Sequence, residues 1–399
     1  MIHKDSLSEK WIFGLGAKTK DDPILIEKVI RALYLLELLK KSGLDFIFKG
    51  GTALMLLFEA PKRFSIDIDI IVPNKPKNLG KVLDGILESS DFLKYSIDER
   101  QTTSSIEKEH YKFYYTPVTN ARAEAEYILL DVLYEMNHYG EHVKNIELSS
   151  QFLMLEGDNV SVVVPTPEAI LGDKLTAFAP NTTGVPYGKE KELEIIKQLF
   201  DIGHLFDMVS DIPIVGQVFS EFAKTELAYR GLKKLKGNDV LDDVFETALL
   251  MGTRGKAGKG EYQEIQSGVK KMKNFIISDG FNIETAMVPA AKAAYLVNLI
   301  KKGNSQIERF GNPMGVKDYI LEQPLETRLN KLKKSNPEAF FYWYKALMLS
   351  TEKELTIHGK EIGALKIAIR YYKSRHSYVS DDIISSILGK LNDGNGFFS

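Results

Sequence analysis

The segment that decides the fold reads Lys49-Gly50-Gly51-Thr52 and continues, eleven residues after the threonine, as Arg63-Phe64-Ser65-Ile66-Asp67-Ile68-Asp69-Ile70. Side chains of an extended strand alternate between two faces, so the isoleucines are expected to face a core while Asp67 and Asp69 project together from the opposite face. Two neighbouring carboxylates repel each other unless water, a cation or a hard metal ion compensates their charge. Because Mg²⁺ prefers carboxylate and phosphate oxygens, the pair predicts a magnesium site.

The glycine pair just upstream predicts an anion site. Gly50 and Gly51 let a ligand approach the backbone closely, and the N–H groups that open the next helix at Thr52 point outward with the positive end of the helix dipole. A phosphate site beside a divalent-cation site indicates a nucleoside triphosphate. Each half alone is also typical of ordinary structure, a solvent-facing edge strand or a simple turn. The two together, with Arg63 and Ser65 between them, favour function.

The flanking sequence predicts an α/β N-terminal half followed by a helical C-terminal half. Hydrophobic periodicity and capping residues predict helices over residues 23–41, 53–58, 77–89 and 167–178. Short apolar or alternating runs predict strands over residues 44–48, 66–72, 93–97, 110–116, 125–134 and 160–164. Helical periodicity dominates from residue 189 to about residue 386. A chain of 399 residues exceeds what one hydrophobic core usually organises, and we expect two domains, residues 1–185 and 186–399.

Composition narrows the class of protein and of metal site. Apolar residues at 44% and charged residues at 27% exclude collagen, a wholly disordered chain and a polytopic membrane protein. The absence of cysteine excludes disulfides, thiolate zinc sites and iron–sulfur clusters, so oxygen or imidazole must bind any metal. Residues 1–20 lack the apolar core of a signal peptide, and charges interrupt the longest apolar stretch, residues 24–39. A cytoplasmic protein with no membrane partner is therefore expected.

The net charge of −2 hides an uneven distribution. Residues 301–375 carry 15 Lys and Arg against 8 Asp and Glu. This excess is compatible with a nucleic-acid partner or with a solvated helical surface. Aromatic and basic residues interleave over residues 340–345 and 371–376, as in surfaces that stack single-stranded RNA, although aromatic stripes in helices are also typical of cores.

Two further patterns fail as sites. The glycine-rich segment 252–260 has neither the spacing nor the final Ser or Thr of a P-loop, so it is interpreted as a basic loop. His138 and His142 lie four residues apart, but Gly140 between them argues against a helical zinc-ligand pair.

The motifs resemble a known family. The glycine segment with Arg63-x-Ser65-x-Asp67-x-Asp69 is similar to the first motif of the AbiEii/AbiGii toxin family, within the DNA polymerase β-like nucleotidyltransferase superfamily. The helix 167–177, which carries Lys174, and the segment 197–202, which carries Asp201, resemble two further family motifs. The likeness covers roughly residues 25–210. The chain departs from the pattern at Gln198, where an Asp is common, and at Gly51, where many superfamily members have Ser.

The resemblance implies a polymerase β-like α/β domain with a mixed sheet and a helical C-terminal domain that completes the cleft. It also implies a toxin of a type IV toxin–antitoxin or phage-defence system, with a cognate antitoxin, that transfers nucleotides from an NTP to RNA. The expected acceptor is the 3′ end of tRNA, and the expected chemistry uses two Mg²⁺ or Mn²⁺ ions. The alternatives are a protein or small-molecule acceptor, or a nucleotide-binding interaction protein without catalysis.

By the same resemblance, the expected catalytic residues are Asp67, Asp69, Asp131, Lys174 and Asp201, and the first three are expected to bind metal. The expected nucleotide-binding residues are Lys49, Gly50, Gly51, Thr52, Arg63 and Ser65. Asp131 stands in an apolar strand, where a lone acid is costly unless it meets a metal or a cation such as Lys174. For Asp201, an ion pair with Lys174 or Arg63 is the structural alternative.

Overall fold

A mixed seven-stranded sheet forms the centre of the N-terminal half, with strand order β3-β4-β5-β2-β1-β7-β6. The computed structural model describes residues 1–98, 107–120, 122–277 and 280–357. The strands are β1 Ile47–Lys49, β2 Ile68–Ile71, β3 Lys94–Ile97, β4 Glu107–Tyr115, β5 Glu126–Tyr134, β6 Val143–Glu147 and β7 Ser161–Pro165. β2 runs parallel to β5 and antiparallel to β1, so the sheet is mixed as predicted.

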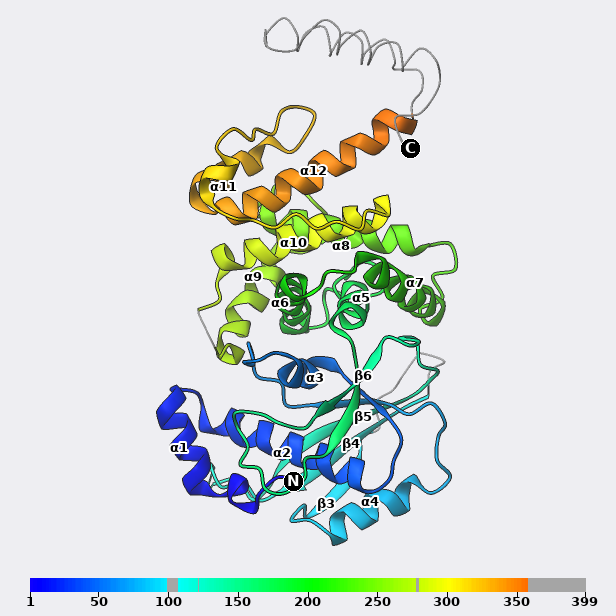
Figure 1. Ribbon diagram of the computed structural model, residues 1–399, viewed down its shortest axis with the longest axis vertical. Coiled ribbons are helices and arrows are strands. Elements are labelled where there is room, and N and C mark those ends of the chain that lie inside the picture. Colours follow the sequence, from blue (N-terminus) through cyan, green and yellow to red (C-terminus); the bar gives the residue numbers. More distant parts are fainter. Residues whose placement is uncertain (99–106, 121, 278–279, 358–399) are drawn as a thin grey trace, which may run out of the picture. The chain divides into compact units, whose positions relative to one another are not determined.

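One face of the sheet packs against N-terminal helices. The long helix α2 (Pro23–Lys41) begins where Asp22 accepts a hydrogen bond of 2.9 Å from the backbone N–H of Ile24. The apolar side of α2, together with α4 (Leu79–Glu88), covers alternate residues of the central strands, among them Ile68, Ile70 and Leu130. Figure 1 shows both helices beside the sheet. The alternation of β2 therefore buries Ile68 and Ile70 on this face, as the sequence predicts.

The opposite face meets helices that follow the last strand in the sequence. α5 (Pro167–Ala177) and α7 (Ile212–Tyr229) contribute Ala169, Val218 and Phe222 to a second core that includes Ile47 of β1 and Ile71 of β2. α6 (Glu192–Met208) lies beside α5, and five further α-helices follow within the described part of the chain. These are α8 Gly237–Gly252, α9 Tyr262–Met272, α10 Ile283–Lys302, α11 Leu332–Ser335 and α12 Pro337–Ile357.

The predicted fold class is confirmed, and the differences are local. The sequence patterns missed β6 and the N-terminal helix α1 (Glu9–Thr19). β1 is three residues long instead of five, and α3 (Gly50–Leu57) begins at the first glycine instead of at Ala53. β1 is short because it pairs with β2 only over Ile47–Lys49 before the chain turns into α3.

The aromatic run of α12 is not a surface for RNA, which corrects that alternative. Phe340 and Trp343 are completely buried, and Tyr342 packs edge-on against Phe206 of α6 with ring centroids 5.2 Å apart. These rings pack in the core because burial removes a large apolar surface area of each ring from water. The second such segment, residues 371–376, lies outside the described residues.

The chain divides into two compact units, Met1–Ala346 and Leu347–Ser399. The predicted boundary between residues 185 and 186 falls inside the first unit and stays a prediction. Within the described ranges, no helix is both long and apolar enough to cross a membrane.

Candidate active site

A row of polar residues crosses four adjacent strands. Lys49 of β1 pairs with Asp69 of β2, Asp69 pairs with Asp131 of β5, and Asp131 pairs with His110 of β4. Residues at paired positions of a sheet project from the same face, so the four side chains lie side by side. Register therefore brings together two acids that are 62 residues apart in the sequence.

A cavity of about 520 Å³ opens over this row. Nine of the eleven predicted site residues line it: Lys49, Gly50, Gly51, Arg63, Ser65, Asp67, Asp69, Asp131 and Lys174. Thr52 and Asp201 lie behind the lining. Thr52 is fully buried, and its hydroxyl donates a hydrogen bond of 2.6 Å to the backbone carbonyl of Asp67. The cavity thus gathers cations, carboxylates and a glycine turn in one place.

Side chains of the site explain the two glycines. Gly50 has a φ of +80°, a conformation that favours glycine, and a Cβ atom there would overlap the Asp69 carboxylate. A Cβ atom on Gly51 would lie 2.5 Å from Arg63 Nη2 and 2.6 Å from Ser65 Oγ. The glycine pair therefore makes room for the acid of β2 and for the Arg63 and Ser65 side chains.

The carboxylates of the row repel one another. Burial, together with the charges of Asp131 and Asp67, raises the pKa of Asp69 to about 7, although Lys49 and Lys174 oppose this shift. A carboxyl group with this pKa is only partly ionised at neutral pH. The negative charge of the three carboxylates is therefore only partly compensated, and a bound cation would compensate it further.

The donor set fits a hard divalent cation, because every acid of the row offers carboxylate oxygens. Asp67 and Asp69 line the same cavity as Asp131, in keeping with the predicted common face. Among the residues that the structure describes, however, no three His, Asp or Glu side chains already converge as a metal-binding group. A hydrogen bond of 2.7 Å holds Asp131 Oδ1 against His110 Nδ1. Binding of a cation would have to draw the acids together.

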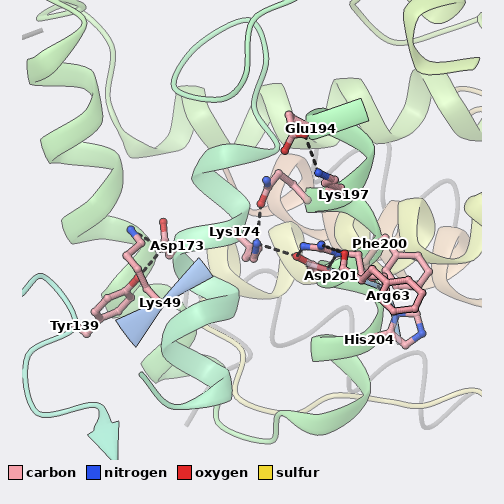
Figure 2. Close-up of polar contacts among 12 residues, drawn as sticks. Lys49, Arg63, Tyr139, Asp173, Lys174, Glu194, Lys197, Phe200, Asp201 and His204 are labelled. Atoms are coloured by element: carbon pink, nitrogen blue, oxygen red, sulfur yellow. Dashed lines mark hydrogen bonds and ion pairs between the residues drawn. The ribbon is translucent and has the colours of Figure 1, made fainter. Parts of the chain in front are cut away.

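Lys49 is held as a cation at the edge of the row. Its Nζ lies 3.3 Å from Asp173 Oδ2 and 5.3 Å from the ring centre of Phe222. Tyr139 donates a hydrogen bond of 2.6 Å to the same Asp173 oxygen (Figure 2). Burial alone would lower the pKa of Lys49, but electrostatic interactions, chiefly with the negative charge of Asp173, raise it well above its ordinary value. Lys49 is thus a fixed positive charge beside Asp69.

A buried ion-pair network anchors the other two cations. Asp201 of α6 accepts two hydrogen bonds from Arg63, 2.7 Å from Nε and 2.8 Å from Nη2, and its Oδ2 lies 2.8 Å from Lys174 Nζ (Figure 2). Burial would raise the pKa of Asp201, but the two cations lower it to about 2. Asp201 therefore forms both of the ion pairs, with Arg63 and with Lys174, that were the structural alternative to a catalytic role. Asp201 fixes the guanidinium and ammonium groups at the cavity wall.

The remaining lining residues were not predicted. They are Leu129, Ile170, Asp173, Ala177, Lys191, Glu194, Lys197 and Gln198. Asp173 stands next to the predicted site residue Lys174, and Lys197 belongs to the segment that resembles a family motif. Their positions in the sequence could therefore have identified both as site residues. The alternative pair Asp131–Lys174 is not formed, because Asp131 bonds to His110 while Lys174 bonds to Asp201 and to Gln198 Oε1 at 3.0 Å.

The fold and this site define the chain as a nucleotidyltransferase. Residues 31–272 match the family described as nucleotidyl transferase AbiEii toxin, type IV TA system, and the chain belongs to this family. It is therefore a toxin nucleotidyltransferase with a nucleoside triphosphate substrate, in a class of systems that pairs each toxin with an antitoxin. The predicted family is confirmed.

Several solved structures are similar at low identity. JHP933 from Helicobacter pylori is 16% identical with a TM-score of 0.40, over 70% of this chain and 94% of that chain. A putative nucleotidyltransferase from H. pylori is 18% identical with a TM-score of 0.40, over 71% of this chain and 97% of that chain. MenT4, a nucleotidyltransferase toxin from Mycobacterium tuberculosis, is 10% identical with a TM-score of 0.39, over 80% and 93%. No curated protein sequence matches the chain. At these scores the likeness identifies neither acceptor nor partner.

Proposed function

We propose that the protein transfers nucleotides from a nucleoside triphosphate to RNA, with the 3′ acceptor end of tRNA as the acceptor. The observation that carries this proposal is the alignment of Lys49, Asp69 and Asp131 on neighbouring strands over one cavity. Nucleotidyl transfer depends on positioning and charge neutralisation more than on a covalent intermediate. A row that combines acids with cations held in place by ion pairs supplies both.

The triphosphate would lie over the turn from β1 into α3. Gly50 and Gly51 offer backbone N–H groups there, and Ser65 adds a hydroxyl. Arg63 and Lys174 present their cationic ends at the cavity wall because Asp201 holds both. Lys191 and Lys197, which line the same cavity, add charge that neutralises phosphate oxygens.

Asp67, Asp69 and Asp131 would hold two divalent ions, Mg²⁺ or Mn²⁺. When bound, such ions polarise the reacting phosphate and lower the pKa of an attacking hydroxyl. Asp131 would lie nearest the acceptor, because β5 stands on the side of β2 away from the glycine turn. His110, hydrogen-bonded to Asp131, would keep that carboxylate in position.

The test incubates purified protein with each labelled NTP, total RNA and Mg²⁺, in parallel with Asp69→Asn and with added EDTA. Label in RNA that is lost in both parallels supports the proposal, and sequencing of the labelled 3′ ends identifies the acceptor. Asp45→Asn, an exposed acid two residues before β1, is the matched control and should retain activity. Label in protein or in small molecules, and not in RNA, would contradict an RNA acceptor and favour the alternative acceptors. Nucleotide binding without any transfer would contradict catalysis.

A further inference from the structure

The open side of β4 carries a basic and aromatic stripe beside the acids. Alternate residues Lys108, His110, Lys112 and Tyr114 share the face of Asp131, because His110 pairs with Asp131 and Tyr114 pairs with Tyr127 of β5. The residues between them face the N-terminal core, where Phe113 is completely buried. The stripe is therefore the solvent side of a strand whose other side is packed.

Two tyrosines form the end of this stripe. The ring centres of Tyr114 and Tyr127 lie 5.9 Å apart, and Tyr127 is 43% exposed. Lys112 Nζ lies 5.2 Å from the ring centre of Tyr127, and Lys94 Nζ of β3 lies 5.1 Å from that of Tyr114. We call these four residues the tyrosine–lysine platform. Figure 1 shows β3, β4 and β5 next to one another in the sheet.

The platform continues from the active-site cavity. Leu129 lines the cavity and lies two residues from both Asp131 and Tyr127 on the same face of β5. Tyr127 and Asp131 lie four positions apart on the strand, a span of about 13 Å. The platform lies on the acceptor side of the row, since β1 and the glycine turn are on the far side of β2. A strand whose end reacts at Asp131 would pass over Leu129 to reach Tyr127.

We propose that the tyrosine–lysine platform binds the single-stranded 3′ end of the acceptor RNA, with an unpaired base stacked on Tyr127. This inference rests on the proposed function, because it assigns a binding surface to the RNA acceptor. Aromatic side chains stack on any base, and lysines attract the phosphates between bases, so rings and ammonium groups together fit a single strand. Lys112 also lies 3.3 Å from Asp98 Oδ2, and phosphate would compete with that carboxylate.

The test measures binding of a fluorescently labelled single-stranded oligoribonucleotide of about twelve nucleotides by fluorescence anisotropy. Tyr127→Ala should weaken binding about 5- to 100-fold, whereas Tyr127→Phe and Tyr127→Trp should bind within about twofold of the native protein because both keep a stacking ring. Phe13→Ala is the matched control, since Phe13 of α1 is also 43% exposed. Lys112→Gln should lower the salt dependence of binding, and Lys144→Gln on β6 is its control.

The outcomes separate this inference from the proposed function. Weaker RNA binding by Tyr127→Ala, with native thermal unfolding and native binding by Tyr127→Trp, supports the platform even if no nucleotide is transferred. Native RNA binding by Tyr127→Ala overturns the platform and leaves the proposed function standing. If Tyr127→Ala binds RNA normally but loses binding to the antitoxin, the surface belongs to a protein partner and the inference is wrong.

Discussion

Asp69 and Asp131 occupy directly paired positions of two parallel neighbouring strands, β2 and β5. Like charges at paired positions destabilise a sheet, and here the charge of Asp67 adds to the repulsion, as the raised pKa of Asp69 indicates. A protein tolerates such an arrangement where function requires it. Loss of one of these acids is therefore expected to raise the stability of the fold and to lower the activity.

Asp69→Asn should keep or raise the stability of the fold while it abolishes transfer. Removal of one charge relieves repulsion worth up to about 1 kcal/mol, but loss of a ligand for a divalent cation should lower the transfer rate at least about 100-fold. Thermal unfolding and nucleotide incorporation check the two effects on the same preparation. A variant that loses stability and activity together would show that Asp69 acts as a structural residue.

Gly50→Ala tests whether the glycine turn exists for Asp69. Gly50 and Gly43 both have a φ of +80°, but a Cβ atom on Gly43 would meet nothing within 4 Å, whereas one on Gly50 would overlap the Asp69 carboxylate. Both substitutions should cost about 1–2 kcal/mol for the left-handed backbone. Gly50→Ala should cost about 1–3 kcal/mol more through the overlap.

Only Gly50→Ala should reduce transfer, because only there must the acid move. Urea unfolding and nucleotide incorporation of both variants measure the difference. Equal losses of stability, or native activity in Gly50→Ala, would mean that the turn and the acid are independent.

The sequence predicts the parts of the site that lie within one strand or one turn. Asp67, the residue before β2, and Asp69 of β2 line the same cavity, as alternation predicts, because the period of a strand depends on local geometry alone. Gly50 and Gly51 line this cavity too, and their neighbours in the fold are side chains of the site. The predicted roles of these residues in binding metal and nucleotide stay predictions.

The rest depends on register between distant segments. His110 meets Asp131 because β4 and β5 pair antiparallel with this offset, and a shift of one residue would turn His110 to the other face. Asp201 and Thr52 were predicted as site residues, yet the structure places both behind the lining, where they hold Arg63, Lys174 and the backbone of Asp67. A motif identifies such residues without telling whether they touch the ligand.

Asp201→Asn should change both the size and the pH dependence of stability. Loss of the carboxylate leaves Arg63 and Lys174 buried without their counter-charge, a change that costs about 3–5 kcal/mol. In the native protein the pKa of Asp201 falls from 3.8 to about 2 on folding. Its contribution, about 2 kcal/mol, is therefore present above pH 4 and is lost as the pH falls toward 2.

Urea unfolding between pH 2 and pH 6 measures this contribution. The difference in unfolding free energy between native protein and Asp201→Asn should shrink by about 2 kcal/mol as the pH falls from 4 to 2. Asp45→Asn, on an exposed acid, should follow the native curve throughout. A constant difference between native protein and Asp201→Asn would show that folding does not lower the pKa of Asp201.

His110 should act on the reaction through Asp131, as a positioning residue. His110→Leu removes the hydrogen bond to Asp131 Oδ1, and the freed carboxylate should lower kcat about 10- to 100-fold, as loss of an outer partner of a ligand commonly does. His110→Asn keeps a polar nitrogen close to the position of Nδ1 and should retain most of the activity.

The measurements for His110 are kcat, KM for the nucleotide and the Mg²⁺ concentration at half-maximal rate. KM should change little in both variants, because the triphosphate site lies across β2 from β4. The Mg²⁺ requirement should rise in His110→Leu and stay near the native value in His110→Asn. Since both substitutions remove the imidazole, equal impairment in the two would assign the effect to the ring itself and would exclude positioning of Asp131 as its cause.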